Sequence, residues 1–309
     1  MEEHKIFRNT RIFYQDILSG NLRVSPEQCF QLIQNVQRQS TSQDFSFLLG
    51  HRLLPGNFSV VSAVCINAAH LQDELDSLLD LGAILTPFLR PRFIYEEHNL
   101  IIDWQDACGA NHNLRFLVEM MMTAFTSVCR WLSGTVLPWH YYFAYAQPVH
   151  VEQYEVNFGN RIEFNSQHNR MVIAREYLYI PWLKASPSAA FFARQEGAVM
   201  LDELPARHGF LVCIYEFLHQ HIHLNPNLEQ TASAFCMSSA GLKRKLQKHH
   251  THFQAQYDAV RRDLALHWKR QEGLSNEQIA NRLHFHDTAN LRRAFKKWTG
   301  LTPAEVKLR

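Results

Sequence analysis

Basic side chains gather in two short stretches near the end of the chain, each spaced so that several lie on one face of a helix. Such a helix can enter the major groove of DNA, where arginine and lysine donate to phosphates and base edges. Small polar residues at the start of each helix, and an asparagine, add further donors and acceptors. The predicted DNA-contacting residues are Ser238, Ser239, Lys243, Arg244, Lys245, Lys248, Thr288, Asn290, Arg292, Arg293, Lys296 and Lys297.

The two basic stretches are the second halves of a weak internal repeat. Residues 232–239 align with 280–287 at an offset of 48, and residues 242–246 align with 291–295 at an offset of 49. Each copy predicts a short helix, a tight turn and a second helix with buried apolar residues, which is the pattern of a helix-turn-helix unit. A plain helical bundle with a solvated basic face is the alternative.

A long helix is predicted between the two copies, over residues 253–270. We expect it to brace both units through a seam of Phe253, Tyr257, Val260, Leu264, His267 and Trp268. Helix-capping residues predict where the first helix of each copy begins. Asn225 and Pro226 resemble an N-cap followed by a first helical residue, and Ser275 with Gln278 forms a capping box.

Charge is distributed unevenly along the 309 residues. Residues 220–309 carry a net charge of +8, whereas residues 1–219 carry −6. A basic domain on an acidic body indicates a polyanionic partner for the C-terminal third, because each phosphate contact releases a counterion. No apolar run has the length of a membrane span, and the six cysteines contain no CxxC pair, so we expect a reduced protein of the cytoplasm with no membrane partner.

The first two thirds of the chain mix helix and strand signals, which predicts an α+β domain over residues 1–195. Residues 196–207 are the expected linker, and residues 208–309 are the expected all-α domain with two helix-turn-helix units. Within the first domain, helices are predicted from 26, over 67–82 and over 113–132, and a hairpin turns near 97–99. Strands are predicted over 139–145, 161–164 and 170–175.

Aromatic side chains in the predicted strand 139–145 offer a wall for a small-molecule cavity. The candidate effector-binding residues are Trp139, Tyr141, Phe143 and Tyr145, with Arg90 and Arg92 as partners for an effector carboxylate. Core packing for the aromatic residues and surface positions for the arginines are the alternatives. The aromatic content favours a small, largely apolar effector with one polar or charged end.

The sequence gives little support for a metal site or a catalytic site. His219 and His223 stand four residues apart, a spacing compatible with zinc on a helix, but no further ligand lies nearby and a structural zinc site needs four. The nucleophile-elbow, P-loop, zincin and dinucleotide-binding motifs are absent. We therefore expect no enzymatic activity, no metal and no cofactor.

At residues 279–303 the sequence IANRLHFHDTANLRRAFKKWTGLTP resembles the second helix-turn-helix and closing signature of the AraC/XylS family of bacterial transcription regulators. Residues 253–265 resemble the family's linker helix, including Arg261 and Ala265. Residues 154–164 and 177–181 resemble the arabinose-binding-type regulatory domain of one subgroup. Two departures stand out: Gly241 lies inside the first recognition helix, and His284 and His286 flank Phe285, where the family usually has Gly before the aromatic and a small polar residue after it.

The resemblance implies a DNA-binding transcription regulator. Its N-terminal domain would sense a small molecule or mediate homodimerisation, and its two recognition helices would enter successive major grooves. The implied partners are promoter DNA, an effector, a second copy of the chain and RNA polymerase. A metal- or ligand-sensing protein that binds nucleic acid without sequence specificity is the alternative.

Overall fold

The computed structural model describes residues 3–20, 23–40, 42, 44–53, 60–204 and 209–305. The chain divides into two compact units, residues 1–209 and residues 210–309, and each is described by itself. No helix in these described ranges is long and apolar enough to cross a membrane.

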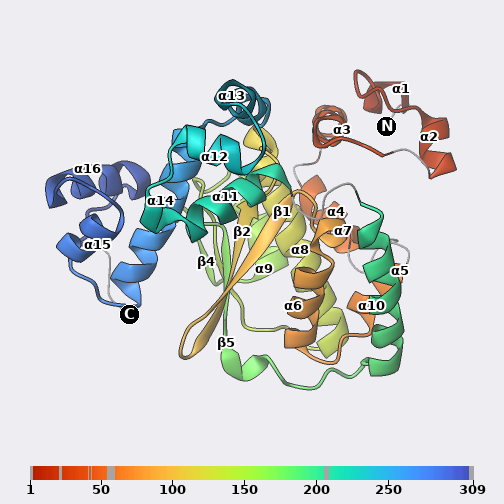
Figure 1. The fold of residues 1–309 in the computed structure, drawn as a ribbon. Coiled ribbons are helices and arrows are strands. Elements are labelled where there is room, and N and C mark those ends of the chain that lie inside the picture. The colour runs from red at the N-terminus through yellow and green to blue at the C-terminus, as the bar shows by residue number, and fades with distance from the viewer. Residues whose placement is uncertain are drawn as a thin grey trace. The chain divides into compact units, whose positions relative to one another are not determined.

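A five-stranded sheet forms the centre of the first unit (Figure 1). Its strands are β1 (Leu89–Tyr95), β2 (Asn99–Asp106), β3 (His140–Tyr142), β4 (Ile162–Glu163) and β5 (Arg170–Ala174), in the order β1-β2-β5-β3-β4. All neighbours are antiparallel except β3 and β4, which are parallel. The predicted hairpin is confirmed, since Tyr95 pairs with Leu100 next to the turn.

The described residues of this unit also form ten α-helices. They are α1 (Glu3–Ile6), α2 (Tyr14–Ser19), α3 (Pro26–Gln39), α4 (Phe45–Leu53), α5 (Val60–Ile66), α6 (Leu71–Asp80), α7 (Gly82–Leu85), α8 (Leu114–Ser133), α9 (Val151–Phe158) and α10 (Pro187–Asp202). The 3-10 helices η1 (Asn111–Asn113) and η2 (Arg175–Tyr177) complete the unit. The α+β class is therefore confirmed.

Helix α8 holds the core of the first unit together. Every residue from Phe116 to Phe125 is buried, so the first half of the helix is covered on all sides and not only on one face. Phe125 packs edge-on against both Trp104 and Trp139, with ring centroids 6.3 and 5.8 Å apart. The prediction of a helix over 113–132 is confirmed to within one residue at each end.

Three predicted boundaries in the first unit differ from the structure. The helix expected over 67–82 begins at Leu71, because the His70 side chain caps it, and Gly82 starts α7 instead of ending a helix. The strand expected over 139–145 spans only His140–Tyr142.

The third difference concerns the expected linker. Residues 196–202 are the last two turns of α10, which buries Gly197 and Leu201, and a Cβ at Gly197 would lie 3.0 Å from Leu81. The buried face of α10 consists mostly of small residues, which let the helix pack tightly. Because large apolar residues are few on this face, the sequence shows little of the apolar periodicity that predicts a helix. Residues 205–208 lie outside the described ranges. The assignment of separate functions to 1–195 and 208–309 stays a prediction.

The second unit is helical throughout its described residues. Its elements are α11 (Phe210–Gln220), η3 (Ile222–Leu224), α12 (Leu228–Ala234), α13 (Ser239–Lys248), α14 (Phe253–Arg270), α15 (Asn276–Arg282) and α16 (Thr288–Thr299). One apolar cluster runs through all of the α-helices. Figure 1 shows α14 as the long helix beside which α15 and α16 lie.

The linking helix α14 has the predicted length, but its seam differs at one position. Tyr257, Val260 and Leu264 are buried as predicted, whereas His267 is exposed and faces Glu272 at 3.8 Å. Asp263 takes a buried place in the seam, where Tyr215 donates to it at 2.8 Å. The hydroxyl of Tyr215 therefore supplies a hydrogen bond that this buried carboxylate needs, at a position outside the predicted seam.

Candidate nucleic-acid interface

Each helix-turn-helix unit begins with a side chain that caps its first helix. Asn227 and Gln230 form a capping box at α12, and Ser275 and Gln278 form the predicted one at α15. The first cap was expected at Asn225, two residues earlier. Asn225 instead ends η3 in the left-handed region (φ 50°), so it cannot start a helix there.

The turns of the two units have the same backbone design. The amide of Met237 donates to Ala232 at 2.9 Å, and the amide of Phe285 donates to Ala280 at 2.9 Å. The residue before each of these donors is left-handed: Cys236 has φ 53° and His284 has φ 57°. A residue without a Cβ suits this conformation best, which gives a physical reason for the glycine expected in place of His284.

The second turn is one residue longer than the first. Ser238 caps α13 directly after Met237, whereas His286 stands between Phe285 and the Asp287 that caps α16. This insertion explains why the offset of the repeat changes from 48 to 49 in the middle of the motif.

The second helix of each unit, α13 or α16, presents a basic outer face. Leu242 and Leu246 are buried in α13, and Leu291 and Phe295 are buried in α16. Eight of the predicted DNA-contacting residues are exposed on these two helices: Lys243, Arg244, Lys245, Lys248, Arg292, Arg293, Lys296 and Lys297. The structure therefore brings the predicted basic residues together on two recognition-helix faces.

Three of the predicted contact residues, Lys245, Ser238 and Asn290, also make contacts within the protein. The ammonium group of Lys245 lies 4.3 Å from the ring centre of Phe210, so this exposed side chain leans on α11. Ser238 accepts from the amide of Gly241, and half-buried Asn290 accepts from Nη2 of Arg293. Ser239 is half-buried as the first residue of α13.

Thr288 and Gly241 belong to the first turns of their helices. Thr288 is half-buried as the first residue of α16. Gly241 is the third residue of α13, and its amide is the one that Ser238 caps. A Cβ at Gly241 would lie 3.2 Å from Oγ of Ser238, so glycine here leaves room for the cap.

Arg261 of α14 is a structural residue that charge and spacing alone did not single out. Its guanidinium carbon lies 4.3 Å from the ring centre of Tyr257 and 4.8 Å from that of Phe285. It is therefore held between the linking helix and the turn of the second unit, and cation–π contacts of this kind stabilise when they are shielded from water.

In the first unit, three of the candidate effector-binding residues are core residues. Trp139, Tyr141 and Phe143 are almost fully buried and pack among other aromatic rings of α8, α9 and the sheet. Tyr145 is half-buried under the guanidinium of Arg115, 5.6 Å from its ring centre. Core packing, the stated alternative, therefore describes the first three.

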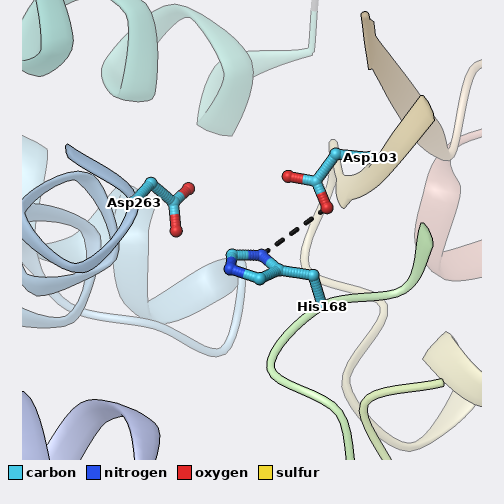
Figure 2. Close-up of side chains that lie close together, drawn as sticks. All are labelled: Asp103, His168 and Asp263. Carbon is cyan, nitrogen blue, oxygen red and sulfur yellow. Dashed lines mark ion pairs between the residues drawn. The ribbon is translucent and has the colours of Figure 1, made fainter. Parts of the chain in front are cut away.

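The candidate Arg92 lies beside a buried carboxylate. Arg92 and Arg170 stand opposite Asp103 on the two strands next to β2. Figure 2 shows the ion pair between Asp103 and His168, with 3.5 Å between Oδ1 and Nδ1. Burial acts to raise the pKa of Asp103, but Arg170, His168 and Arg92 outweigh it, so the pKa lies below its usual range. Arg90 is half-buried opposite Gln105.

Asp263, also drawn in Figure 2, belongs to the second unit, where Tyr215 and Arg262 hold it. The histidines weighed as zinc ligands are separated by the end of a helix. His219 belongs to α11, whereas His223 belongs to η3, and both are exposed. They do not share one α-helical face, so the i, i+4 argument for a metal does not apply to them.

A pocket of about 400 Å³ opens in the first unit. None of the candidate effector residues predicted from the sequence lines it, although Tyr145 lies against its residue Arg115. It is bordered by the end of α3, the start of α4, the start of α8 and the loop before α9. Its lining is Gln37, Ser40, Ser42, Phe45, Ser46, His112, Arg115, Phe116, Glu119 and His150.

Two family models match the chain. Residues 1–182 match the arabinose-binding N-terminal domain of the AraC transcription regulator, and residues 231–309 match a helix-turn-helix domain. Among curated proteins, the ornithine utilization regulator of Pseudomonas aeruginosa is 26% identical, over 98% of this chain and 89% of that protein. The HTH-type transcriptional regulator AdiY of Escherichia coli is 27% identical over 29% of this chain and 36% of its own.

A solved structure, that of the transcriptional regulator CdpR from Pseudomonas aeruginosa, matches with a TM-score of 0.43 and 19% identity. The match covers 94% of this chain and 95% of that one.

Proposed function

The chain belongs to the AraC family of transcription regulators, with an arabinose-binding-type N-terminal domain, and we propose that it binds specific promoter sequences through α13 and α16. The observation that carries this proposal is the pair of capped helices with buried apolar and exposed basic faces. Two such helices on one rigid core can read two short DNA elements at once. Ordinary helical bundles have no need of basic faces at both positions.

The exposed positions of the side chains support an assignment of individual DNA contacts. Arg293, Lys296 and Lys297 lie on the outer face of α16, and Arg244 and Lys248 lie on that of α13. Arginine that donates to guanine, and asparagine that pairs with adenine, give base specificity, whereas most lysines contact phosphate. We assign base reading to Asn290 and Arg292 and phosphate contact to Lys297.

We further propose that a small-molecule effector bound by the first unit controls DNA binding in the cytoplasm. A relative that matches over nearly the whole chain is named for ornithine utilization, which makes amino acids and amines the first compounds to test. A homodimer and a contact with RNA polymerase complete the proposed regulatory assembly.

The test begins with genome-wide mapping of binding sites, followed by titration of the full chain against one mapped site. Replacing Arg292 and Arg293 together with alanine should weaken specific binding by about 1–3 kcal/mol for each base that the variant no longer reads. Lys297→Ala should instead weaken binding to all sequences alike and reduce the slope of log K against log salt by about 0.9.

Arg130→Ala is the matched control, because Arg130 is an exposed arginine of α8 in the first unit. It should leave the affinity for the mapped site unchanged. If the Arg292/Arg293 double variant kept its affinity for the mapped site, the proposal that α16 contacts bases would be contradicted. Equal affinity of the unmodified chain for mapped and random DNA would favour non-specific nucleic-acid binding.

A further inference from the structure

The pocket of the first unit contains one arginine whose orientation is fixed by the protein. Nε of Arg115 donates to Oε1 of Glu119 at 2.7 Å, and Nη2 lies 2.8 Å from Nε2 of His150. Because a guanidinium has five N–H groups and these two contacts engage only Nε and Nη2, N–H groups remain for a ligand.

The charges around Arg115 leave it as the pocket's accessible cation. Glu119 is the acidic residue of the lining, and its side chain is 5% exposed against 38% for Arg115. Both carboxylate oxygens of Glu119 already accept, from Arg115, Tyr154 and Ser46. Burial, followed by the charge of Arg115, lowers the pKa of His150, which disfavours a second cation beside Arg115.

Two helix starts add to the positive potential of the same pocket. Phe45 and Ser46 begin α4, and Arg115 and Phe116 lie in the first turn of α8, which follows η1 directly, so the N-terminal turns of both helices border it. The two helices pack closely side by side, since a Cβ at Gly50 would lie 2.7 Å from Cβ of Thr123. Helix N-termini carry partial positive charge and unpaired N–H groups, which favour an anion.

The other residues that line the pocket indicate the polarity of the part of the ligand that does not contact Arg115. Phe45 and Phe116 stack with ring centroids 6.1 Å apart and form an apolar wall. Serine hydroxyls, Gln37 and His112 supply hydrogen-bonding groups around it. This lining is more polar than the largely apolar effector expected from the aromatic content of the sequence would require.

We propose that this pocket binds a small carboxylic acid, whose carboxylate pairs with Arg115 and whose polar chain contacts the serine hydroxyls and the Phe45–Phe116 wall. A carboxylate matches the paired N–H groups of a guanidinium in geometry as well as charge. The site deepens the proposed effector role of the first unit and rests on it only for its regulatory meaning.

Calorimetry and thermal unfolding of the full chain test the site directly. The probes are L-alanine, L-lactate, 4-aminobutyrate, 5-aminovalerate and succinate, each beside its amide. At least one acid should bind and raise the melting temperature, whereas its amide should bind more weakly by about tenfold or more, because the amide cannot form the charge-assisted pair. Absence of binding by all five acids, or equal binding of acid and amide, would overturn the site.

Variants locate the carboxylate. Arg115→Met combined with Glu119→Gln removes both charges together, so no buried charge is left unpaired, and it should weaken acid binding about tenfold or more. Arg130→Met on the same helix should leave acid binding unchanged. Equal losses of affinity in the two proteins would overturn the assignment to Arg115.

If the double variant does not fold, a second pair of variants tests whether the acid binds in this pocket. Gln37→Trp places a large ring at the exposed rim of the pocket and should block acid binding, whereas Arg38→Trp, at the neighbouring exposed residue outside the lining, should not. DNA titrations then separate the two proposals. Acid binding that leaves DNA affinity unchanged contradicts the effector role alone, and specific DNA binding without acid binding contradicts the pocket alone.

Discussion

Among single residues, Glu74 of α6 has the most unusual environment. Its side chain is completely buried, near the thiol of Cys65 and the guanidinium of Arg194. Burial raises its pKa from 4.5 to about 8, against the opposing effects of Cys65 and Arg194. A carboxyl group that stays protonated in the folded state but ionises in the unfolded state makes stability depend on pH.

The sign follows from which state holds the proton. Below pH 4.5 both states are protonated, and Glu74 contributes no pH dependence. Between pH 4.5 and about 8 only the folded state keeps the proton, so the free energy of unfolding falls by up to about 1.4 kcal/mol per pH unit. Glu74→Gln should remove this slope, as measured by urea unfolding of the full chain between pH 5 and pH 8.

Asp80→Asn is the control for the loss of an acidic group, since Asp80 is exposed at the end of the same helix. It should keep the pH dependence of the unmodified chain. If Glu74→Gln also kept it, Glu74 would be ionised in the folded state.

The charge of a residue on the recognition helices is easier to predict from sequence than the contacts that the residue makes. The basic residues of the recognition helices were predictable because they alternate with buried leucines at helical spacing. The engagement of Lys245 with Phe210 was not, because Phe210 lies 35 positions earlier and reaches it only through the packing of α11. The charge of a residue is visible in the sequence, but its partner depends on tertiary structure.

At the scale of elements, Arg261 is expected to fix the second helix-turn-helix on the linking helix. Arg261→Met keeps most of the aliphatic stem and removes the cation between Tyr257 and Phe285, at a cost of about 0.5–2 kcal/mol. Because Phe285 precedes α16, this variant should lose discrimination at the base pairs that α16 reads while keeping it at those read by α13. Titrations against sites changed in one element at a time measure both.

Arg261→Lys is the conservative control. It keeps the positive charge, so it should retain more discrimination than the methionine variant if the cation matters. An equal loss of discrimination at both DNA elements would indicate a phosphate contact or general destabilisation, and would contradict the positioning role.

Elements were predictable where local signals coincide. The capping box of Ser275 and Gln278, the proline that opens α3 and the apolar spacing of α8 all act within a few residues. The carboxylate pocket draws its lining from residues 37–46, 112–119 and 150, and no periodicity links these segments. Helix α10 was missed in part because its buried face is made of small residues.

At the scale of the whole molecule, the uneven charge separates two kinds of dependence. The basic residues 220–309 should set the salt dependence of DNA binding, whereas the acidic residues 1–219 carry the proposed effector pocket. If effector and DNA binding are coupled, each must change the affinity for the other by the same factor. Calorimetry of the acid in the presence and absence of site DNA therefore checks the coupling measured by DNA titration.

The spacing of the DNA elements is the last prediction, and it follows from the length of α14. Its 18 residues span about 27 Å, at 1.5 Å per residue. With recognition helices beyond its ends, this length fits two major grooves on one face of a duplex, about 34 Å apart. A mapped site should therefore contain two unlike elements of three or four base pairs each, with centres about 10–10.5 base pairs apart.

Changing the spacing of these elements distinguishes two reading helices from one. Inserting about five base pairs turns one element to the opposite face of the duplex, so binding by the full chain should fall towards its level on random DNA. A full-turn insertion should not restore binding, because α14 is a continuous helix packed against α11 and α16 and cannot stretch. A site of unchanged length with bases altered outside both elements is the control. Full affinity after the half-turn insertion would mean that only one helix-turn-helix unit recognises bases. The unit expected not to recognise them is the first, which has Gly241 in its recognition helix.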